Sequence, residues 1–274
     1  MTDYRAIRKA VVPAAGLGTR LLPLSRICPK EMLPLVNRPV LEWVINEMAA
    51  AGIAEMLVIV NQQKPMIQDY FGSGSNWNVH IEYTNQDKPL GLGHAVLLAE
   101  NWVGEEPFLV AFGDCVIESN RAEPPSTRIY RHFINKDATA VALVEEVPLE
   151  SVSRYGVLRP ADDFISSKLE PFPASDIIEK PPIEQAPSRY AVAARWALSH
   201  SIFKELRTIQ PGRSGEVQLT DAIHQSVASG GKLWGVPLLP NERRHDIGNV
   251  ESYVRSFIHL ASVSGYSVEG QRPQ

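Results

Sequence analysis

Short apolar runs rich in valine and isoleucine alternate with amphipathic segments through the first half of the chain. The apolar runs predict strands, and the segments with apolar residues three and four positions apart predict helices. We expect strands at 9–14, 55–60, 79–83 and 107–112, and helices at 39–50, 64–71 and 93–101. This alternation favours βαβ units, in which a largely parallel sheet carries helices on both faces.

The second half is less regular, because its apolar runs are shorter and are separated by proline-rich segments. We expect strands at 138–144, 155–158, 176–179 and 190–195, and helices at 199–208, 219–228 and 250–262. The chain has 274 residues and a hydrophobic content of 44%, which is enough for a sizeable core. We therefore expect a single domain at 1–264, followed by a flexible tail at 265–274.

Composition and charge narrow the class of partner. The formal net charge of −4 gives no global basic field, so we expect neither nucleic acid nor a membrane surface as partner. The two cysteines, Cys28 and Cys115, lie far apart and favour a reduced, cytoplasmic protein. The first residues show no apolar secretory segment, and no run approaches the ~18 apolar residues of a spanning helix.

The most informative stretch is VVPAAGLGTRLLPLSRICPKEMLP at 11–34, where a strand runs into a loop with two glycines. Glycine can reach positive φ and approach a ligand closely, and consecutive N–H groups can form an anion-binding concavity. Gly16 and Gly18 alone would favour an ordinary tight turn after a strand. Arg20, which can bind phosphate bidentately, and Lys30, a point charge, favour a polyphosphate loop. The string matches neither the P-loop nor the dinucleotide fingerprint.

Two further positions are candidates for base and metal binding. Gln86 precedes the turn that contains Gly91, and a glutamine amide can both donate to and accept from a base. His94 follows in the same turn and is expected to be structural, because no nucleophile is adjacent. Asp114 ends the strand at 107–112 and is a possible Mg²⁺ ligand. Taken alone, a routine helix start at 91 and a turn or N-cap aspartate at 114 remain open.

Three charged residues complete the set of candidates. Lys180 precedes a proline, so it lies in an extended segment and can present a fixed cation, while Glu179 can accept hydroxyl groups. Alone, such a pair is more often a solvated turn. Asp246, in RRHDIG, can supply a second carboxylate to a metal or, with His245, belong to a satisfied polar turn.

Together these motifs resemble the bacterial UTP–glucose-1-phosphate uridylyltransferases. The resemblance rests on GLGTRLLP, PKEMLPLVNRPV, GLGHAV, an aspartate ending an apolar strand, YGV, EKP, GEVQLTDAI and HDIGN, from residue 9 to about 260. It implies an α/β, Rossmann-like nucleotidyltransferase fold with a mixed, mostly parallel central sheet and helices on both faces. The nucleotide-binding half would span about 1–118, the sugar-phosphate half about 137–248, and a C-terminal helix about 250–262.

The resemblance also implies residue roles and a reaction. By similarity, the nucleotide-binding residues would be Ala14, Ala15, Gly16, Gly18, Thr19, Arg20, Gln86 and Gly91, and the sugar-phosphate-binding residues Gly156, Glu179 and Lys180. Asp114 and Asp246 would hold Mg²⁺, and Arg20, Lys30 and Lys180 would be catalytic. The implied reaction transfers a uridylyl group from UTP to glucose 1-phosphate, giving UDP-glucose and pyrophosphate, in a cytoplasmic homo-oligomer, a dimer or a tetramer.

The chain also departs from this family. It has Leu90, Gly113 and Ala194 where members often have lysine, proline and glycine, and the segment between Gln63 and Val79 is shorter. These departures leave open dTTP or a purine triphosphate as donor, and another sugar or cyclitol phosphate as acceptor. A weakly active regulatory paralogue is the other alternative, although every charged position of the site is filled.

Overall fold

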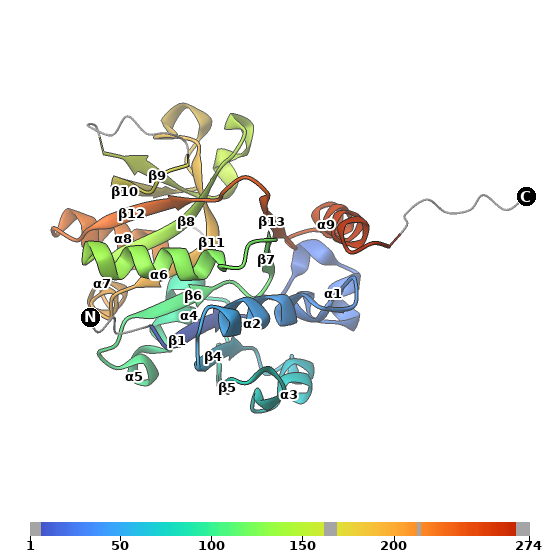
Figure 1. Cartoon of the computed structure of the whole chain (residues 1–274). Coiled ribbons are helices and arrows are strands. Elements are labelled where there is room, and N and C mark those ends of the chain that lie inside the picture. Colours follow the sequence, from blue (N-terminus) through green and yellow to red (C-terminus); the bar gives the residue numbers. More distant parts are fainter. Residues whose placement is uncertain (1–6, 162–168, 213–214, 267–274) are drawn as a thin grey trace, which may run out of the picture.

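The computed structural model describes residues 7–161, 169–212 and 215–266. These residues form a nine-stranded sheet in the order β5–β4–β1–β6–β11–β8–β12–β10–β9, with helices on both faces (Figure 1). The strands are β1 (Lys9–Pro13), β4 (Glu55–Val60), β5 (His80–Asn85), β6 (Phe108–Ala111), β8 (Ala140–Glu146), β9 (Gly156–Pro160), β10 (Phe172–Glu179), β11 (Tyr190–Leu198) and β12 (Leu233–Pro237).

Helices flank the sheet, and two short strand pairs stand outside it. The helices are α1 (Leu24–Ile27), α2 (Val40–Ala50), α3 (Pro65–Phe71), α4 (Leu92–Leu97), α5 (Glu100–Val103), α6 (Pro125–Lys136), α7 (Ile202–Leu206), α8 (Leu219–Ala228) and α9 (Val250–Val263). The separate pairs are β2 (Pro34–Leu35) with β3 (Arg38–Pro39), and β7 (Cys115–Ser119) with β13 (Glu242–Asp246). No helix of the described ranges is both long and apolar enough to cross a membrane.

The sheet is mixed, and only its first half is parallel throughout. β5, β4, β1 and β6 pair in parallel, as the alternation of strands and helices predicts. In the second half β8 and β12 are parallel, but β11 is antiparallel to β6 and β8, and β10 is antiparallel to β12 and β9. The expectation of a mostly parallel sheet is therefore wrong beyond β6. Antiparallel neighbours need no crossover helix, which suits the short proline-rich connections of this half.

The elements expected from hydrophobic pattern are confirmed with shifted ends, and others were missed. The helix expected at 93–101 is divided into α4 and α5. Sequence patterns gave no indication of β7, α6, β12 or β13, and β13 (ERRHD) consists entirely of charged residues and histidine. A strand of that composition is defined by its pairing partner rather than by its own sequence. The tail expected at 265–274 lies, from 267 on, outside the described residues.

The continuous apolar runs of the first half reflect burial on both faces of the sheet. In β1, Ala10 and Val12 join the core that includes α2 and α6, whereas Val11 points to the core that includes α7 and α8. This is the two-residue period of a strand buried on both sides. Because β1, β4, β5 and β6 are parallel, the loops that leave their carboxyl ends emerge at one edge, where ligands of open α/β sheets bind.

One residue in β11 has a backbone conformation that favours glycine. The register of β11 against β8 shifts between Val192 and Trp196, and inside this irregularity Ala194 has φ = +58°. Its carbonyl accepts hydrogen bonds from the backbone N–H of Phe112 (3.2 Å) and from Nη1 of Arg195 (3.0 Å). These bonds hold a non-glycine residue in the left-handed region, which costs free energy.

We expect Ala194→Gly to raise the free energy of unfolding by about 0.5–1 kcal/mol, because glycine reaches this φ without a steric penalty. Urea unfolding measures the change. Ala193→Gly is the matched control, since Ala193 is equally buried and is not among the residues with positive φ. The control should lose about 1 kcal/mol. Equal losses in both variants would contradict the strain at residue 194.

Candidate active site

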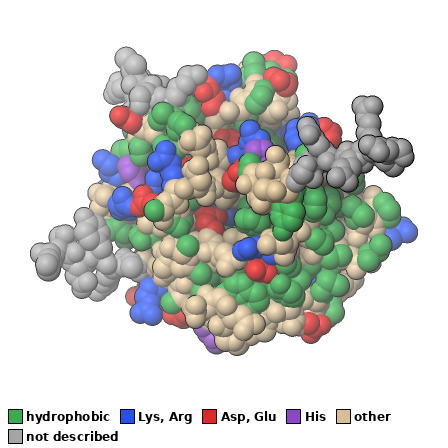
Figure 2. Space-filling view, turned by 45° about the vertical axis from the view of Figure 1, so that its right-hand side comes forward, with side chains coloured by type: hydrophobic (Ala, Val, Ile, Leu, Met, Phe, Trp, Pro, Cys, Tyr) green, Lys and Arg blue, Asp and Glu red, His purple; other side chains and the backbone are tan. Residues whose placement is uncertain are grey.

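A cavity of about 880 Å³ lies at the carboxyl ends of β1 and β6. Its other walls come from the segments around 154–156, 179–180 and 216–220, and from β13 and α9. This volume lies at the upper end of the range of small-molecule sites. Over the face shown in Figure 2, basic and acidic side chains are interspersed rather than gathered into one basic field. Any anion bound here must therefore be held by the local charges of the cavity.

Most residues expected from the sequence meet in this cavity. It is lined by Ala15, Gly16, Arg20, Lys30, Gln86, Gly91, Asp114, Gly156, Glu179, Lys180 and Asp246. Ala14, Gly18 and Thr19 belong to the same loop but do not line the cavity. Ala14 is buried, and Gly18, with φ = +65°, precedes the 3-10 turn Thr19–Leu21.

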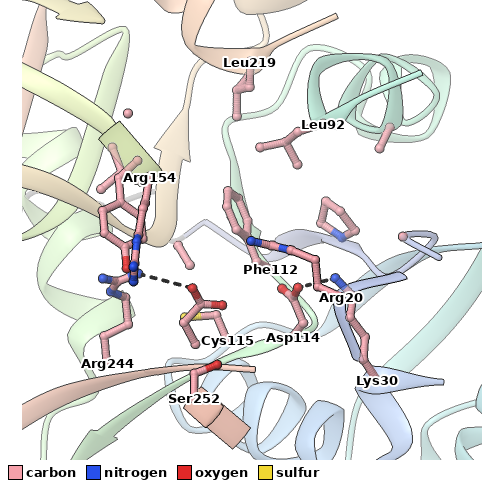
Figure 3. Close-up of a pocket in the computed structure, with 18 of the residues that line it drawn as sticks. Arg20, Lys30, Leu92, Phe112, Asp114, Cys115, Arg154, Leu219, Arg244 and Ser252 are labelled. Carbon is pink, nitrogen blue, oxygen red and sulfur yellow. Dashed lines mark hydrogen bonds and ion pairs between the residues drawn. The ribbon is translucent and has the colours of Figure 1, made fainter. Parts of the chain in front are cut away.

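Asp114 and Asp246 are brought together by the β7–β13 ribbon. In that ribbon Asp246 is registered opposite Cys115, the residue after Asp114. Asp114 pairs with the ammonium group of Lys30, and Figure 3 shows these two side chains pointing toward one another, with Arg20 on the same side of the cavity. Burial disfavours both charges, but their attraction outweighs it, so the pKa of Asp114 lies below its ordinary value and that of Lys30 above it. Burial, and then the charge of Asp114, raises the pKa of Asp246.

Arg244 stands on the other side of Asp246 and was missed as a site residue. Its guanidinium donates through Nε (3.0 Å) and Nη2 (2.5 Å) to Oε1 of Glu145, and it lies over the ring of Tyr155. Nη1 is 4.0 Å from Oδ2 of Asp246. Burial lowers the pKa of Arg244, but Glu145 outweighs it and raises it above its ordinary value. The second carboxylate is thus fixed beside a permanent positive charge.

A buried lysine braces the glycine loop from below. Nζ of Lys64 donates to the carbonyls of Ala14 (2.9 Å) and Gly16 (2.5 Å) and to Oε2 of Glu31 (2.8 Å). These three bonds use all three donors of an ammonium group. Burial raises the pKa of Glu31 and lowers that of Lys64. The sequence offered one signal for Lys64, because it follows the carboxyl end of β4, the neighbour of β1.

The segment from Gln86 to His94 forms a small hydrogen-bonded unit. Nε2 of Gln86 is 3.0 Å from the carbonyl of Gly91 and 2.9 Å from Nδ1 of His94. Because the amide nitrogen can only donate, both of its N–H groups are used, and His94 must accept through Nδ1. Gly91 has φ = +94°, and a Cβ there would lie 2.6 Å from the carbonyl oxygen of Val217. A glycine is therefore required where this segment packs against the GEVQL string.

The opposite wall of the cavity combines a carboxylate, a lysine and a hydroxyl group. Oγ1 of Thr220 donates to Oε2 of Glu179 (3.1 Å), and Nζ of Lys180 lies 3.1 Å from Oε1 of the same carboxylate. Lys180 has φ = +45°, so its backbone also occupies the left-handed region. A Cβ on Gly156 would lie 2.8 Å from Cγ2 of Thr220 and 3.3 Å from Oε2 of Glu179, which explains why this wall has glycine at 156. Thr220, from GEVQLTDAI, was missed as a site residue.

The nucleotidyl transferase family model matches residues 9–262 of the chain. The chain belongs to this family. A UTP–glucose-1-phosphate uridylyltransferase of Bacillus subtilis (strain 168), YngB, is 38% identical over 242 residues, which cover 81% of this chain and 79% of YngB. A second uridylyltransferase of that strain is 32% identical over 94% of this chain and 92% of its own length. The resemblance inferred from the motifs is confirmed, and this nucleotidyltransferase is an enzyme of that class.

Solved structures agree with this assignment. A UDP-glucose pyrophosphorylase complexed with UDP-glucose has a TM-score of 0.84 and 31% identity, covering 94% of this chain and 99% of its own. A UTP-bound enzyme of the same kind from Acinetobacter baumannii has a TM-score of 0.80 and 30% identity, covering 93% of both chains. The family assignment and the fold therefore agree.

We expect Lys64→Met to lower the free energy of unfolding of this nucleotidyltransferase by about 3–5 kcal/mol, because it leaves Glu31 buried without its cation. Urea unfolding measures the loss. The double variant Lys64→Met, Glu31→Gln removes both charges and should recover the part of the loss that comes from the unpaired carboxylate, but not the part that comes from the carbonyls of Ala14 and Gly16. A loss below about 1 kcal/mol in Lys64→Met would show that the pair does not brace the loop.

Proposed function

We propose that this nucleotidyltransferase transfers the uridylyl group of UTP to glucose 1-phosphate, giving UDP-glucose and pyrophosphate. The observation that carries the proposal is the meeting of two separate cationic walls in one cavity. Arg20 and Lys30 stand on the side of the glycine loop, and Lys180 stands beside Glu179 on the opposite wall. Such an arrangement suits two phosphate-bearing substrates, and the related proteins bind UTP and UDP-glucose.

The reaction needs charge neutralisation more than acid–base chemistry. An oxygen of the sugar phosphate attacks the α-phosphorus of UTP in line, and the bond to the bridging oxygen breaks as pyrophosphate leaves. The attacking oxygen is already ionised at neutral pH, so no general base is required. Arg20 would bind the departing pyrophosphate, Lys30 would stand at the α-phosphoryl group, and Lys180 would bind the sugar phosphate. Positioning and electrostatic stabilisation then supply the catalysis.

Asp114 and Asp246 would hold Mg²⁺ in this scheme. The donor set fits, because Mg²⁺ is usually bound through one or two carboxylates together with substrate phosphates. Burial, and then repulsion from Asp114, raises the pKa of Asp246, and a divalent cation bound between the two carboxylates would relieve that repulsion. When bound, the ion would neutralise phosphate charge. Lys30, which pairs with Asp114, would lie close to the same phosphate group and would add to its neutralisation.

The base would be selected through the carbonyl of Gln86. Sequence reasoning gave this amide both a donor and an acceptor role, but its two N–H groups are used within the protein. Its Oε1 is then the group available to a base, and it can accept from the N3–H of uracil or thymine. Cytosine and adenine present an acceptor at the central position of their pairing edge instead, whereas guanine presents a donor there and is not distinguished by this contact. UTP should therefore be preferred over CTP and ATP, with dTTP as its nearest competitor.

A pyrophosphate-release screen tests the function. UTP, dTTP, CTP, ATP and GTP are each paired with glucose 1-phosphate and with a panel of other sugar and cyclitol 1-phosphates. The pair of UTP and glucose 1-phosphate should give the highest kcat/KM. A preference for CTP, ATP or GTP would overturn the uridylyltransferase assignment, and turnover no faster than the blank would favour a regulatory paralogue.

We expect Asp114→Asn and Asp246→Asn each to lower kcat by at least ~10²-fold, because each removes a charge from the metal-holding pair. Steady-state rates at limiting Mg²⁺ measure the loss, and circular dichroism checks that the fold is kept. Asp137→Asn is the control, since Asp137 is an exposed surface aspartate. Near-native activity in either cavity variant would exclude that aspartate from the metal site.

The His94 contact gives a prediction on base selection. His94→Ala frees one N–H of the Gln86 amide, so the kcat/KM ratio of UTP to CTP should fall about tenfold. His94→Asn restores an acceptor oxygen near the position of Nδ1 and should recover most of the ratio. Competition assays with both triphosphates measure it. An unchanged ratio in His94→Ala, with only a lower rate, would contradict the positioning role.

A further inference from the structure

A second cluster of metal-ligating side chains lies beside the cavity and has no part in the scheme above. Glu118 comes from β7, His245 from β13 and His259 from α9. Oε2 of Glu118 is 3.0 Å from Nε2 of His245 and 2.8 Å from Nε2 of His259. All three potential ligand atoms lie within 4.8 Å of one another. Three separate elements thus converge on one point.

We propose that Glu118, His245 and His259 form a binding site for a first-row transition-metal dication of the Zn²⁺ class. Two imidazole nitrogens and one carboxylate oxygen are a donor set that suits Zn²⁺ and Co²⁺, whereas Mg²⁺ prefers oxygen ligands only. The site is therefore chemically distinct from the pair formed by Asp114 and Asp246.

The present spacing is close to what such an ion requires. Ligand atoms at ~2.1 Å from a tetrahedral zinc are about 3.4 Å apart. Two of the three separations are 2.8 and 3.0 Å, so these hydrogen bonds need to open only slightly. His259 is 29% exposed and can adjust, while His245 is buried and fixed. Both histidines line the cavity, so water can complete the coordination.

Arg243 is the group that competes with the ion. Its Nη1 lies 3.0 Å from Nδ1 of His259, and arginine can only donate, so Nδ1 accepts and Nε2 carries the proton. Coordination through Nε2 requires the proton on Nδ1 instead. In His259 the proton therefore moves from Nε2 to Nδ1 through solvent, and the exposed Arg243 side chain turns away. Nε2 of His245 also donates to Glu118, so its proton must move to Nδ1 in the same way, with no net release from either ring. The cost of that exchange limits the affinity.

The experiment uses the full chain, freed of metal and then kept in saturating Mg²⁺ so that sites with oxygen ligands are filled. Co²⁺ is titrated and followed by visible absorption, and Zn²⁺ is titrated by calorimetry. We expect one Co²⁺ per chain with the spectrum of nitrogen coordination, displaced by Zn²⁺. At a hundredfold excess over Kd, the Zn²⁺ should raise Tm by about 5 °C or more.

Matched variants test the ligand set. His259→Gln and Glu118→Gln should each weaken Co²⁺ binding by at least about tenfold. His80→Gln is the control, since His80 is an exposed histidine 3.8 Å from a carboxylate of Glu82, and should bind as the wild type does. Arg243→Gln should tighten binding by about tenfold, because its carbonyl can accept from the protonated Nδ1.

Two outcomes would overturn the proposal. One is the absence of any Mg²⁺-resistant Co²⁺ binding in both the wild type and Arg243→Gln. The other is a His259→Gln variant that binds Co²⁺ as tightly as the wild type does. The Arg243→Gln variant is expected to bind Co²⁺ more tightly. It therefore tests the site even if the variants of the metal ligands, His259→Gln and Glu118→Gln, fail to fold.

Discussion

The cavity depends on two lysine–carboxylate pairs that hold three loops against one another. Lys30 with Asp114 joins the glycine loop to the end of β6, and Lys64 with Glu31 joins that same loop to the end of β4. Each pair is at least largely buried, where charge interactions are strong and an unpaired charge is costly. These two ion pairs therefore hold the glycine loop, which would face the triphosphate, in place already in the protein without ligand.

This arrangement explains how a slightly acidic protein can suit highly anionic substrates. Three cations of the cavity stand next to carboxylates: Lys30 by Asp114, Arg244 by Glu145 and Lys180 by Glu179. Paired cations are held in place without a large positive field, and they remain able to contact phosphate oxygens. Lys180 and Ala194, whose backbones lie in the left-handed region, both line the cavity, and functional sites are where proteins commonly tolerate such conformations.

The sequence predicted the part of the fold that hydrophobic pattern controls. The runs around Val11 and Val58 are buried on both faces, and their periodicity alone gave the parallel half of the sheet. It could not predict β13, whose residues are all charged or histidine and whose strand exists only through pairing with β7. Lys64 was likewise missed, because its importance comes from reaching back some fifty residues to Ala14. Candidate site residues could be predicted where a sequence motif contains them. The residues that support those motifs from elsewhere in the chain could be recognised only from the three-dimensional structure.

The β7–β13 ribbon has a consequence for how such a site can change over time. Asp246 ends β13, and Asp114 immediately precedes β7 at the same end of this antiparallel ladder, where its carbonyl accepts from the backbone N–H of Ile247 (3.0 Å). Strand pairing therefore contributes to the separation of the two aspartates. In a strand, a shift of one residue turns every side chain to the opposite face. An insertion or deletion within either strand would thus remove a carboxylate from the cavity at once, while point substitutions nearby would leave its position intact. The two strands can therefore accept substitutions of their side chains more readily than a change in the number of their residues.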